Sequence, residues 1–290
     1  MIGIREYNKK IGSLKNTRKM TKTMKMVSAS KFKRAYKAQS NAQVYAQKLS
    51  DMMGRLSGSN TARHPLMKAH AAAKNALIVL FTSDRGLCGG FNNNLMRELR
   101  RWIEANRYKF TKMEFCFCGR RGYTAFRKSV TVKKYYENIT VKPNFADALT
   151  VAKDISGSFM SEEFDEGFLV YNHFKGPLLQ EPVIEKILPL TAEAILKTQE
   201  KLKFKADYLF EPEEEDLFNF LVPKYLNFKI YFTLLENAAG EHGARMTAMD
   251  NAARNTGDLI DRYTLLRNRA RQASITTELI EIISGAEALK

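Results

Sequence analysis

The sequence predicts an α/β protein in which the N- and C-terminal helices form a long antiparallel, left-handed coiled coil and a Rossmann-like α/β domain is inserted between them. Residues 4–56 and 224–286 contain no proline, as expected for two long helices. Between them, apolar runs typical of strands alternate with helical patterns, the order of an α/β layer. The predicted parts are an N-terminal coiled-coil helix (1–56), a linker (57–75), an α/β globular domain (76–210) and a C-terminal coiled-coil helix (211–290).

Each predicted terminal helix carries a seam, a line of small or apolar residues spaced alternately by four and three. This spacing is the heptad repeat of left-handed coiled coils. A helix over 224–286 would be roughly 95 Å long, whereas a compact domain of this chain length is roughly 50 Å across. The helix must therefore project from the domain, and a projecting helix with a narrow apolar seam needs a partner helix. The open alternative is two separate amphipathic helices lying on an ordinary domain. The seam residues are Ala38, Ala42, Tyr45, Leu49, Met52 and Leu56 in the first helix, and Leu259, Tyr263, Leu266, Ala270, Ala273, Thr277, Ile280 and Ile283 in the last.

The middle of the chain predicts five strands and three helices with substantially parallel pairing. A linker of small and polar residues around Ser57–Asn60 precedes them. Strands are expected at 76–82, 115–118, 130–136, 168–174 and, more weakly, 183–190. Helices are expected at 92–108, 122–128 and 144–160.

The chain leaves this domain through an acidic segment that begins at Glu211. Pro212 suits a first helical position, and the carboxylates after it oppose the positive end of the helix dipole. Pro223 interrupts the pattern further along the chain. We therefore expect a short helix, a kink, and then the long helix.

The formal net charge of +16 is the strongest compositional feature. Much of it lies on the first helix, which has twelve Lys and Arg residues from Arg5 to Lys37. The only acidic residue before Asp51 is Glu6. Such a surface attracts nucleic acid, an anionic membrane surface or an acidic protein collar. The stretch holds few aromatic residues for base stacking. A basic coiled-coil nucleic-acid-binding protein remains the alternative function.

Several protein classes are disfavoured by composition. No apolar run is long enough to cross a bilayer, so direct membrane insertion is not expected. The first residues lack the apolar core of a secretory signal. The cysteines, Cys88, Cys116 and Cys118, form no C-x-x-C pair, which favours buried thiols in a reducing compartment. We expect no metal site and no cofactor.

A glycine-rich turn at Thr82–Asn92 follows a strand and precedes a helix, where phosphate-binding loops occur. It lacks the Lys-Ser/Thr of a P-loop and the spacing of a dinucleotide fingerprint. A tight turn with close backbone approach explains its glycines better. Asp84 and Arg85 have no partner base nearby in the sequence, so an enzyme acting alone is not expected. A nucleotide-binding α/β enzyme is the second rival.

Three stretches together resemble the gamma subunit of the F-type ATP synthase. They are IGSLKNTRKMTKTMKMVSASK at Ile11–Lys31, SDRGLCGGFN at Ser83–Asn92, and ARQASITTELIEIISGA at Ala270–Ala286. The resemblance implies a non-catalytic central stalk, or rotor shaft, in a proton- or sodium-translocating ATP synthase. The shaft would couple ion-driven rotation of the membrane ring to conformational change at the catalytic sites of the alpha/beta ring.

The resemblance also implies partners and contact residues. Three alpha and three beta subunits would surround the shaft, and the α/β domain would bind the epsilon subunit and the membrane c-ring, with no nucleic acid. Met24 and Lys25 would face lever loops of beta. Arg271, Gln272, Thr276 and Glu278 match a catch region, and Leu279, Ile280, Ile282 and Ile283 the shaft tip. The protein would work peripherally on the cytoplasmic face of a bacterial inner membrane.

Overall fold

The computed structural model describes residues 3–56, 64–70, 73–190 and 214–288 of the chain. It contains two long helices, α1 (Ile4–Leu56) and α6 (Glu214–Ala288). The residues divide into two compact units. Unit 1 holds Met1–Ser28 and Met246–Lys290, and unit 2 holds Ala29–Arg245.

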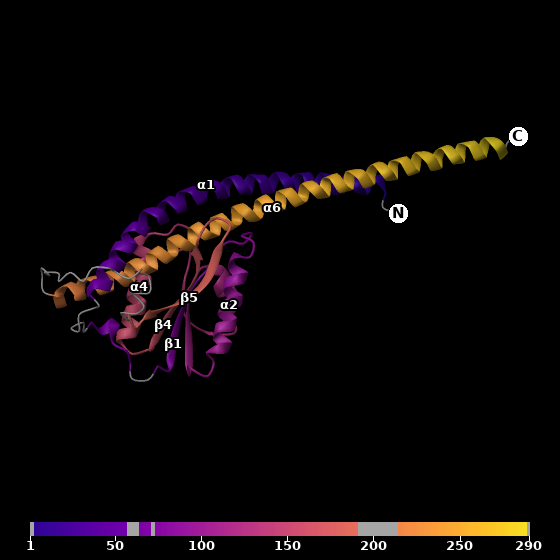
Figure 1. Ribbon diagram of the computed structural model, residues 1–290. Helices are drawn as coiled ribbons and strands as arrows, with labels where there is room; N and C mark the ends of the chain where they lie inside the picture. The colour runs from indigo at the N-terminus through magenta and orange to yellow at the C-terminus, as the bar shows by residue number, and fades with distance from the viewer. Residues whose placement is uncertain (1–2, 57–63, 71–72, 191–213, 289–290) are drawn as a thin grey trace. The chain divides into compact units, whose positions relative to one another are not determined.

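Unit 2 contains a mixed sheet of five strands in the order β3-β2-β1-β4-β5 (Figure 1). β4 and β5 pair antiparallel, and the other neighbours pair parallel. The predicted Rossmann-like layer is therefore confirmed, with each expected strand and helix present. The strands are β1 (Asn75–Phe81), β2 (Lys112–Cys118), β3 (Thr131–Tyr136), β4 (Glu166–Phe174) and β5 (Gln180–Leu188).

Helices cover both faces of the sheet (Figure 1). The helices are α2 (Phe91–Ala105), α3 (Arg120–Phe126) and α4 (Phe145–Met160), with a short 3-10 helix, η1, at Pro65–Met67. Leu95 and Leu99 of α2 pack with Phe126 of α3 on one face. On the other face, α4 and the first part of α6 share a second apolar cluster. Because β1 is covered on both faces, six of its seven residues are buried, as parallel strands require.

α6 is one continuous helix through Pro223, so the predicted separate short helix is wrong, and the kink at Pro223 stays a prediction. Leu221, Val222 and Leu226 on either side of the proline are buried in the core of unit 2. Burial of large apolar side chains contributes roughly 1.5–3 kcal/mol each, which offsets the cost of a proline inside a helix, about 3 kcal/mol. The helix start predicted at Pro212, the domain boundary at residue 210 and the first part of the linker lie outside the described residues.

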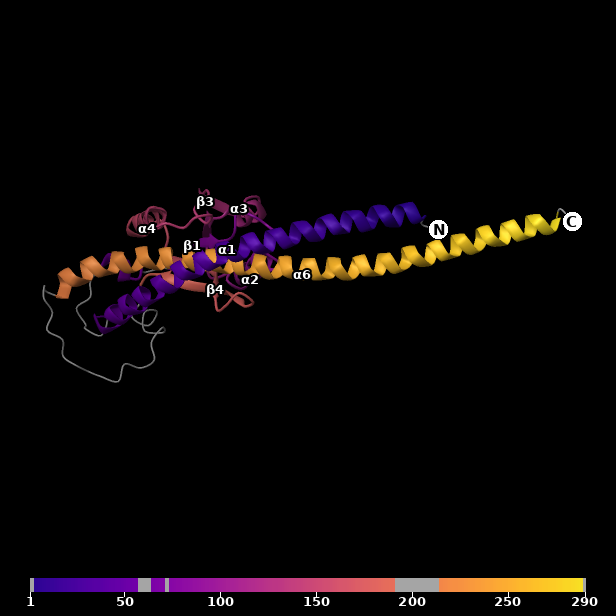
Figure 2. The ribbon, with the colours of Figure 1, turned by 90° about the horizontal axis from the view of Figure 1, so that it is seen from above.

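In unit 1, the first half of α1 runs antiparallel beside the second half of α6 (Figures 1 and 2). Tyr7 lies 6.3 Å from Tyr263 between ring centroids, while Lys25 pairs with Asp250. Moving forward along α1 thus moves backward along α6, as the antiparallel prediction requires. The buried residues of α6 in this unit include Met249, Ala253, Thr256 and Ile260.

The seams follow the predicted spacing, but some residues were assigned wrongly. In unit 2 the covered positions of α1 are Phe32, Ala35, Gln39, Ala42, Ala46, Leu49 and Met53, which are half-buried or buried. Ala42 and Leu49 were predicted correctly, whereas Ala38, Tyr45 and Met52 are exposed. In unit 1, Tyr263, Leu266 and Ala270 are half-buried as expected, but Leu259 is exposed and Ile260 is buried. Polar residues in the seam caused the shift, because a pattern search assumes that only small or apolar residues face inward.

Candidate functional site

The end of α6 is exposed to solvent on every side. Every residue from Arg271 to Glu287 is exposed, including the seam residues Ala273, Thr277, Ile280 and Ile283, so this part of the predicted helix pair is wrong. The physical reason is length, because α1 begins at Ile4 and the ring contact of Tyr7 already reaches Tyr263. The seam of α6 continues where the described part of α1 has ended.

The predicted shaft tip lies within this exposed end. Leu279 is 53% exposed, Ile280 58%, Ile282 67% and Ile283 61%. Single exposed apolar residues are ordinary, but a contiguous group marks an interaction surface. We call Arg271–Glu287 the exposed end of α6. Its apolar side chains have no cover within the described residues.

The predicted catch residues lie at the beginning of the exposed end. Arg271, Gln272, Thr276 and Glu278 are all exposed. The Thr276 hydroxyl donates to the carbonyl oxygen of Gln272 at 2.9 Å, so it is satisfied within the helix. The side chains of Arg271 and Gln272 are free to meet an external partner on geometric grounds.

Met24 and Lys25 lie within unit 1 on α1, and both are half-buried. The Lys25 ammonium donates to Asp250 Oδ1 of α6 at 2.5 Å, and Arg254 donates to the other oxygen of the same carboxylate. Hydrogen bonds from Lys25 and Arg254 lower the pKa of Asp250. Any partner that binds Lys25 must therefore compete with an ion pair inside the chain.

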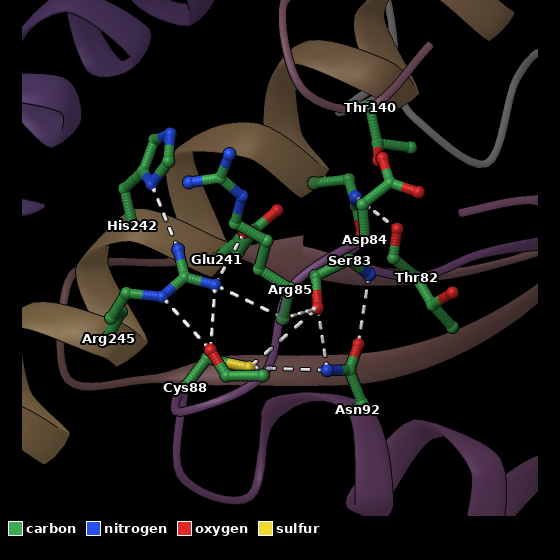
Figure 3. A network of polar contacts seen from close by, with 12 residues as sticks. Thr82, Ser83, Asp84, Arg85, Cys88, Asn92, Thr140, Glu241, His242 and Arg245 are labelled. Carbon is green, nitrogen blue, oxygen red and sulfur yellow. Dashed lines mark hydrogen bonds and ion pairs between the residues drawn. The ribbon is translucent and has the colours of Figure 1, made fainter. Parts of the chain in front are cut away.

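The glycine-rich turn at Thr82–Asn92 is held by its own hydrogen bonds (Figure 3). The Ser83 amide donates to Asn92 Oδ1 at 3.0 Å, and Asn92 Nδ2 donates to Ser83 Oγ at 2.7 Å. Asp84 accepts from the Arg120 amide at 2.9 Å and from the Thr140 hydroxyl at 2.6 Å. Asp84 thus ties β1 to the segments that follow β2 and β3, and its two oxygens are occupied by structural donors.

The positive φ of Gly89 supports the predicted tight turn, whereas the atoms nearest to a Cβ on Gly86 belong to the flexible side chain of Arg121 and not to the backbone. A Cβ on Gly86 would lie 2.5 Å from Arg121 Nη2, and Gly89 has a φ of +59°. The side chain of Arg245 reaches the same turn from α6. Its Nε and Nη2 donate to the carbonyl oxygen of Gly86 at 3.2 and 3.1 Å, and Nη2 also donates to that of Arg85 at 3.2 Å.

Arg245 is one member of a polar row on α6; the sequence string Ala244-Arg245-Met246 belongs to the resemblance, but no role was predicted for the row. Glu241 Oε1 accepts from Arg245 Nη2 at 2.7 Å, and both side chains are more than nine-tenths buried. Asn237 Nδ2 donates to the carbonyl oxygen of Thr82 at 3.3 Å. The sequence feature that could have indicated this row is the four-residue spacing of its polar residues within a stretch of Ala and Gly, because residues four apart lie on the same side of a helix.

The thiols lie in the interior, as predicted. Cys88, Cys116 and Cys118 are buried, and burial raises the pKa of Cys116 to about 12. Such thiols are unreactive at neutral pH. In the described part of the chain, no three His, Cys, Asp or Glu residues gather as they would to hold a metal ion. Among the same residues, no helix is both long and apolar enough to span a membrane.

The two paired long helices, the inserted α/β layer and the uncovered apolar helix end define a subunit of a larger assembly. A family model described as ATP synthase matches residues 3–289. An ATP synthase gamma chain of Trichlorobacter lovleyi is 41% identical over the full length of both chains, and one of Geotalea daltonii is 40% identical, also over both full lengths. The chain belongs to the ATP synthase gamma chain family.

Solved structures agree with this assignment. A chain in the central stalk and c-ring structure of the Tetrahymena thermophila mitochondrial ATP synthase is 28% identical, with a TM-score of 0.58. The match covers 80% of this chain and 99% of that one. A chain of the Euglena gracilis mitochondrial ATP synthase rotor shares the fold, with a TM-score of 0.66, 22% identity, and coverage of 94% and 98%.

Proposed function

We propose that this chain is the central stalk subunit of an F-type ATP synthase. It couples ion-driven rotation of a membrane ring to conformational change at the catalytic sites of a ring of three alpha and three beta subunits. The chain itself is a non-catalytic subunit. The exposed end of α6 carries this proposal, because its apolar side chains need a covering surface and family membership supplies one in the alpha/beta ring.

The coupling has a simple physical basis. A helix pair without threefold symmetry presents a different face to each of three beta subunits, so their nucleotide sites differ at any instant. Rotation exchanges the faces. A switch of this kind requires that each face binds one conformation of the site better than the others. Contacts that break at every step should be weak individually, which suits exposed charged residues.

The proposed contacts follow the positions of the residues. Met24 and Lys25 would face lever loops of beta, and Arg271, Gln272, Thr276 and Glu278 would form the catch. Leu279, Ile280, Ile282 and Ile283 would turn within an apolar sleeve of the ring. The α/β layer of unit 2 would bind the epsilon subunit and the membrane c-ring. Family membership favours these protein partners over nucleic acid, although the exposed lysines of α1, such as Lys15, Lys19 and Lys22, suit either.

The proposed location is the cytoplasmic face of a bacterial inner membrane, held there by the complex. The bacterial relatives of matching length support it. The driving ion, a proton or a sodium ion, is a property of the membrane ring and not of this chain.

Assembly tests the proposal directly. We would co-express the chain with matching alpha and beta subunits and purify through nuclease treatment and high salt. The expected product is a complex of three alpha, three beta and one copy of this chain that hydrolyses ATP. A chain that stays apart and carries nucleic acid until salt removes it would contradict the proposal, because counterion release makes such binding steeply salt-dependent.

The catch contact has its own test. Arg271→Ala with Gln272→Ala should lower ATP turnover of the assembled complex about fivefold, as expected for losing about 1 kcal/mol of exposed polar contacts. Circular dichroism of the full-length chain should stay unchanged, because both side chains are exposed. Arg101→Ala with Asn93→Ala, an exposed pair of the same chemistry on α2, is the control. Equal turnover in both double variants would show that the catch is dispensable.

A further inference from the structure

One stretch of α6 is enclosed on all sides within unit 2. The nine residues from Thr233 to Glu241 are all buried, which is unusual for a helix in a domain of this size, where one face normally meets water. Three residues within it are small: Ala238, Ala239 and Gly240. The polar row of Asn237, Glu241 and Arg245 lies on one side of this stretch, at four-residue spacing.

The polar row meets the sheet where α/β proteins usually bind a ligand. In open α/β sheets the ligand crevice lies beyond the carboxyl ends of the strands, where the strand order reverses. Here that place is beyond β1, between β2 and β4. The carbonyl oxygens of Arg85 and Gly86 lie there and accept hydrogen bonds from Arg245 of α6 (Figure 3). The carbonyl oxygen of the buried Thr82 accepts a hydrogen bond from Asn237 of the same helix. The chain's own helix occupies the position of a ligand.

We infer that Asn237, Glu241 and Arg245 are positioning residues that lock α6 to the α/β layer, so that the layer and the helix turn as one body. We call this set the α6 joint. The inference rests on the proposed function, since only a rotating shaft must transmit torque from the layer to the helix. Arg245 is the last residue of unit 2, and α6 continues beyond it without a break.

Apolar packing holds this part of α6, since Leu234 and Leu235 are buried, but it fixes the rotation of the helix less sharply than directional bonds do. The hydrophobic effect is non-directional, and Ala238, Ala239 and Gly240 beside the polar row have no large side chains to interlock with the layer. Hydrogen bonds, in contrast, weaken steeply when their angles change. The guanidinium of Arg245 binds two carbonyl oxygens and one carboxylate at once, so a small rotation or slide of α6 breaks several bonds together.

The chemistry of the joint favours a role in specificity over one in stability. A buried ion pair such as Arg245 with Glu241 is often no more stable than well-packed apolar residues in its place. The pair does hold the guanidinium plane in a fixed orientation toward the turn. The turn itself is held by hydrogen bonds between Ser83 and Asn92.

The test compares ion pumping with ATP hydrolysis in the complete membrane-bound complex carrying Glu241→Leu with Arg245→Met. This double variant replaces the buried pair by apolar side chains and removes the bonds to the turn. We expect the ratio of ATP-driven pumping to ATP hydrolysis to fall at least about fivefold, the lower end of ordinary coupling between sites. A membrane-potential dye reports pumping of either ion.

Two further variants separate positioning from folding. Arg245→Lys keeps the charge beside Glu241 but lacks the rigid, planar donor geometry of the guanidinium, so it should give an intermediate ratio. Leu95→Ala removes a fully buried side chain of α2; it should lower the thermal midpoint yet keep the ratio. The inference is overturned if the double variant pumps normally, or if the ratio simply follows thermal stability across all variants. Failure of the wild-type chain to assemble would instead overturn the proposed function.

Discussion

At the scale of single residues, the charges around the α6 joint control how the protein responds to acid. His242 Nδ1 lies 3.3 Å from Arg245 Nη1. Burial, followed by the charges of Arg245 and Lys31, lowers the pKa of His242 to about 4. Burial disfavours the charged form of Glu241 as well, and for a carboxyl group this raises the pKa. The joint is therefore arranged with a neutral histidine beside a cationic arginine at neutral pH.

The lowered pKa of His242 predicts a loss of stability in mild acid. Its folded pKa lies below the unfolded value of 6.5, so the unfolded chain binds the proton more tightly. Neutral His242 makes its full contribution to the free energy of unfolding above the unfolded-state pKa, and this contribution is lost as the pH falls toward the folded-state pKa. At about pH 5 the free energy of unfolding should be lower by about 1–2 kcal/mol for this reason. His242→Gln should remove this part of the pH dependence.

Urea unfolding of the full-length wild-type and His242→Gln chains at about pH 7 and about pH 5 measures the difference. The comparison cancels groups present in both chains, including Glu241 and His173. A hydrogen bond to Glu236 raises the pKa of His173, so His173 favours folding at low pH and loses that contribution as the pH rises through its folded pKa. Parallel free-energy changes in the two chains would contradict the assignment to His242.

At the scale of elements, the sequence predicted the kinds and order of helices and strands but not which residues line the helix pair. Alternating apolar runs and glycine turns are local signals, so all five strands were found. The seams depend on buried polar residues such as Gln39, Thr21 and Ser28, which no hydrophobic pattern marks as interior. Thr21 can be buried because its hydroxyl donates to the carbonyl oxygens of Thr17 and Arg18.

The candidate site likewise has a part that the sequence indicated and a part that it did not. The resemblance singled out the stretch that forms the exposed end of α6, although the seam predicted there is uncovered, and the contacts of its residues stay predictions. The α6 joint could not be predicted, because Arg245 and Gly86 are 159 positions apart in the chain and their contact exists only when α6 crosses the end of β1. Likewise, Pro223 predicted a break between a short and a long helix, since local rules do not include the core contacts of Val222 and Leu226.

Two neighbouring methionines of α1 test the corrected seam. Met53 is fully buried, whereas Met52, the residue predicted from the pattern, is 45% exposed. Met53→Ala should lower the free energy of unfolding by about 2–4 kcal/mol, the range for a buried methionine truncated to alanine. Met52→Ala should lower it by about 0.5 kcal/mol or less. Denaturant unfolding of both variants decides, and equal losses would show that Met53 is not the residue of this pair that faces the interior.

At the scale of the whole molecule, the chain combines a packed α/β layer with a helix end that buries no side chain against the described rest of the chain. The free energy of burial of the residues from Thr276 onward becomes available only when other chains cover them. Fully burying a large aliphatic side chain contributes roughly 1.5–3 kcal/mol, so four such residues at the tip can stabilise an assembly strongly. The net charge of +16 keeps the uncovered chain soluble through repulsion.

Removal of residues 276–290 should therefore separate folding from assembly. The thermal midpoint of the truncated chain should stay within about 2 °C of the full-length value, because exposed substitutions and deletions have small effects on stability. The complex with alpha and beta subunits should dissociate at lower temperature, and its affinity should fall at least about tenfold, which corresponds to roughly 1.4 kcal/mol.

A full-length variant with serine at Leu279, Ile280, Ile282 and Ile283 distinguishes lost apolar area from lost length. If apolar contact holds the tip in the ring, this variant should weaken the complex as much as the truncation does. A complex weakened only by truncation would show that the backbone and polar groups of the exposed end make the contact. A truncated chain that melts far below the full-length one would show that the exposed end packs on the chain's own fold, contrary to the exposure of every residue from Arg271 to Glu287.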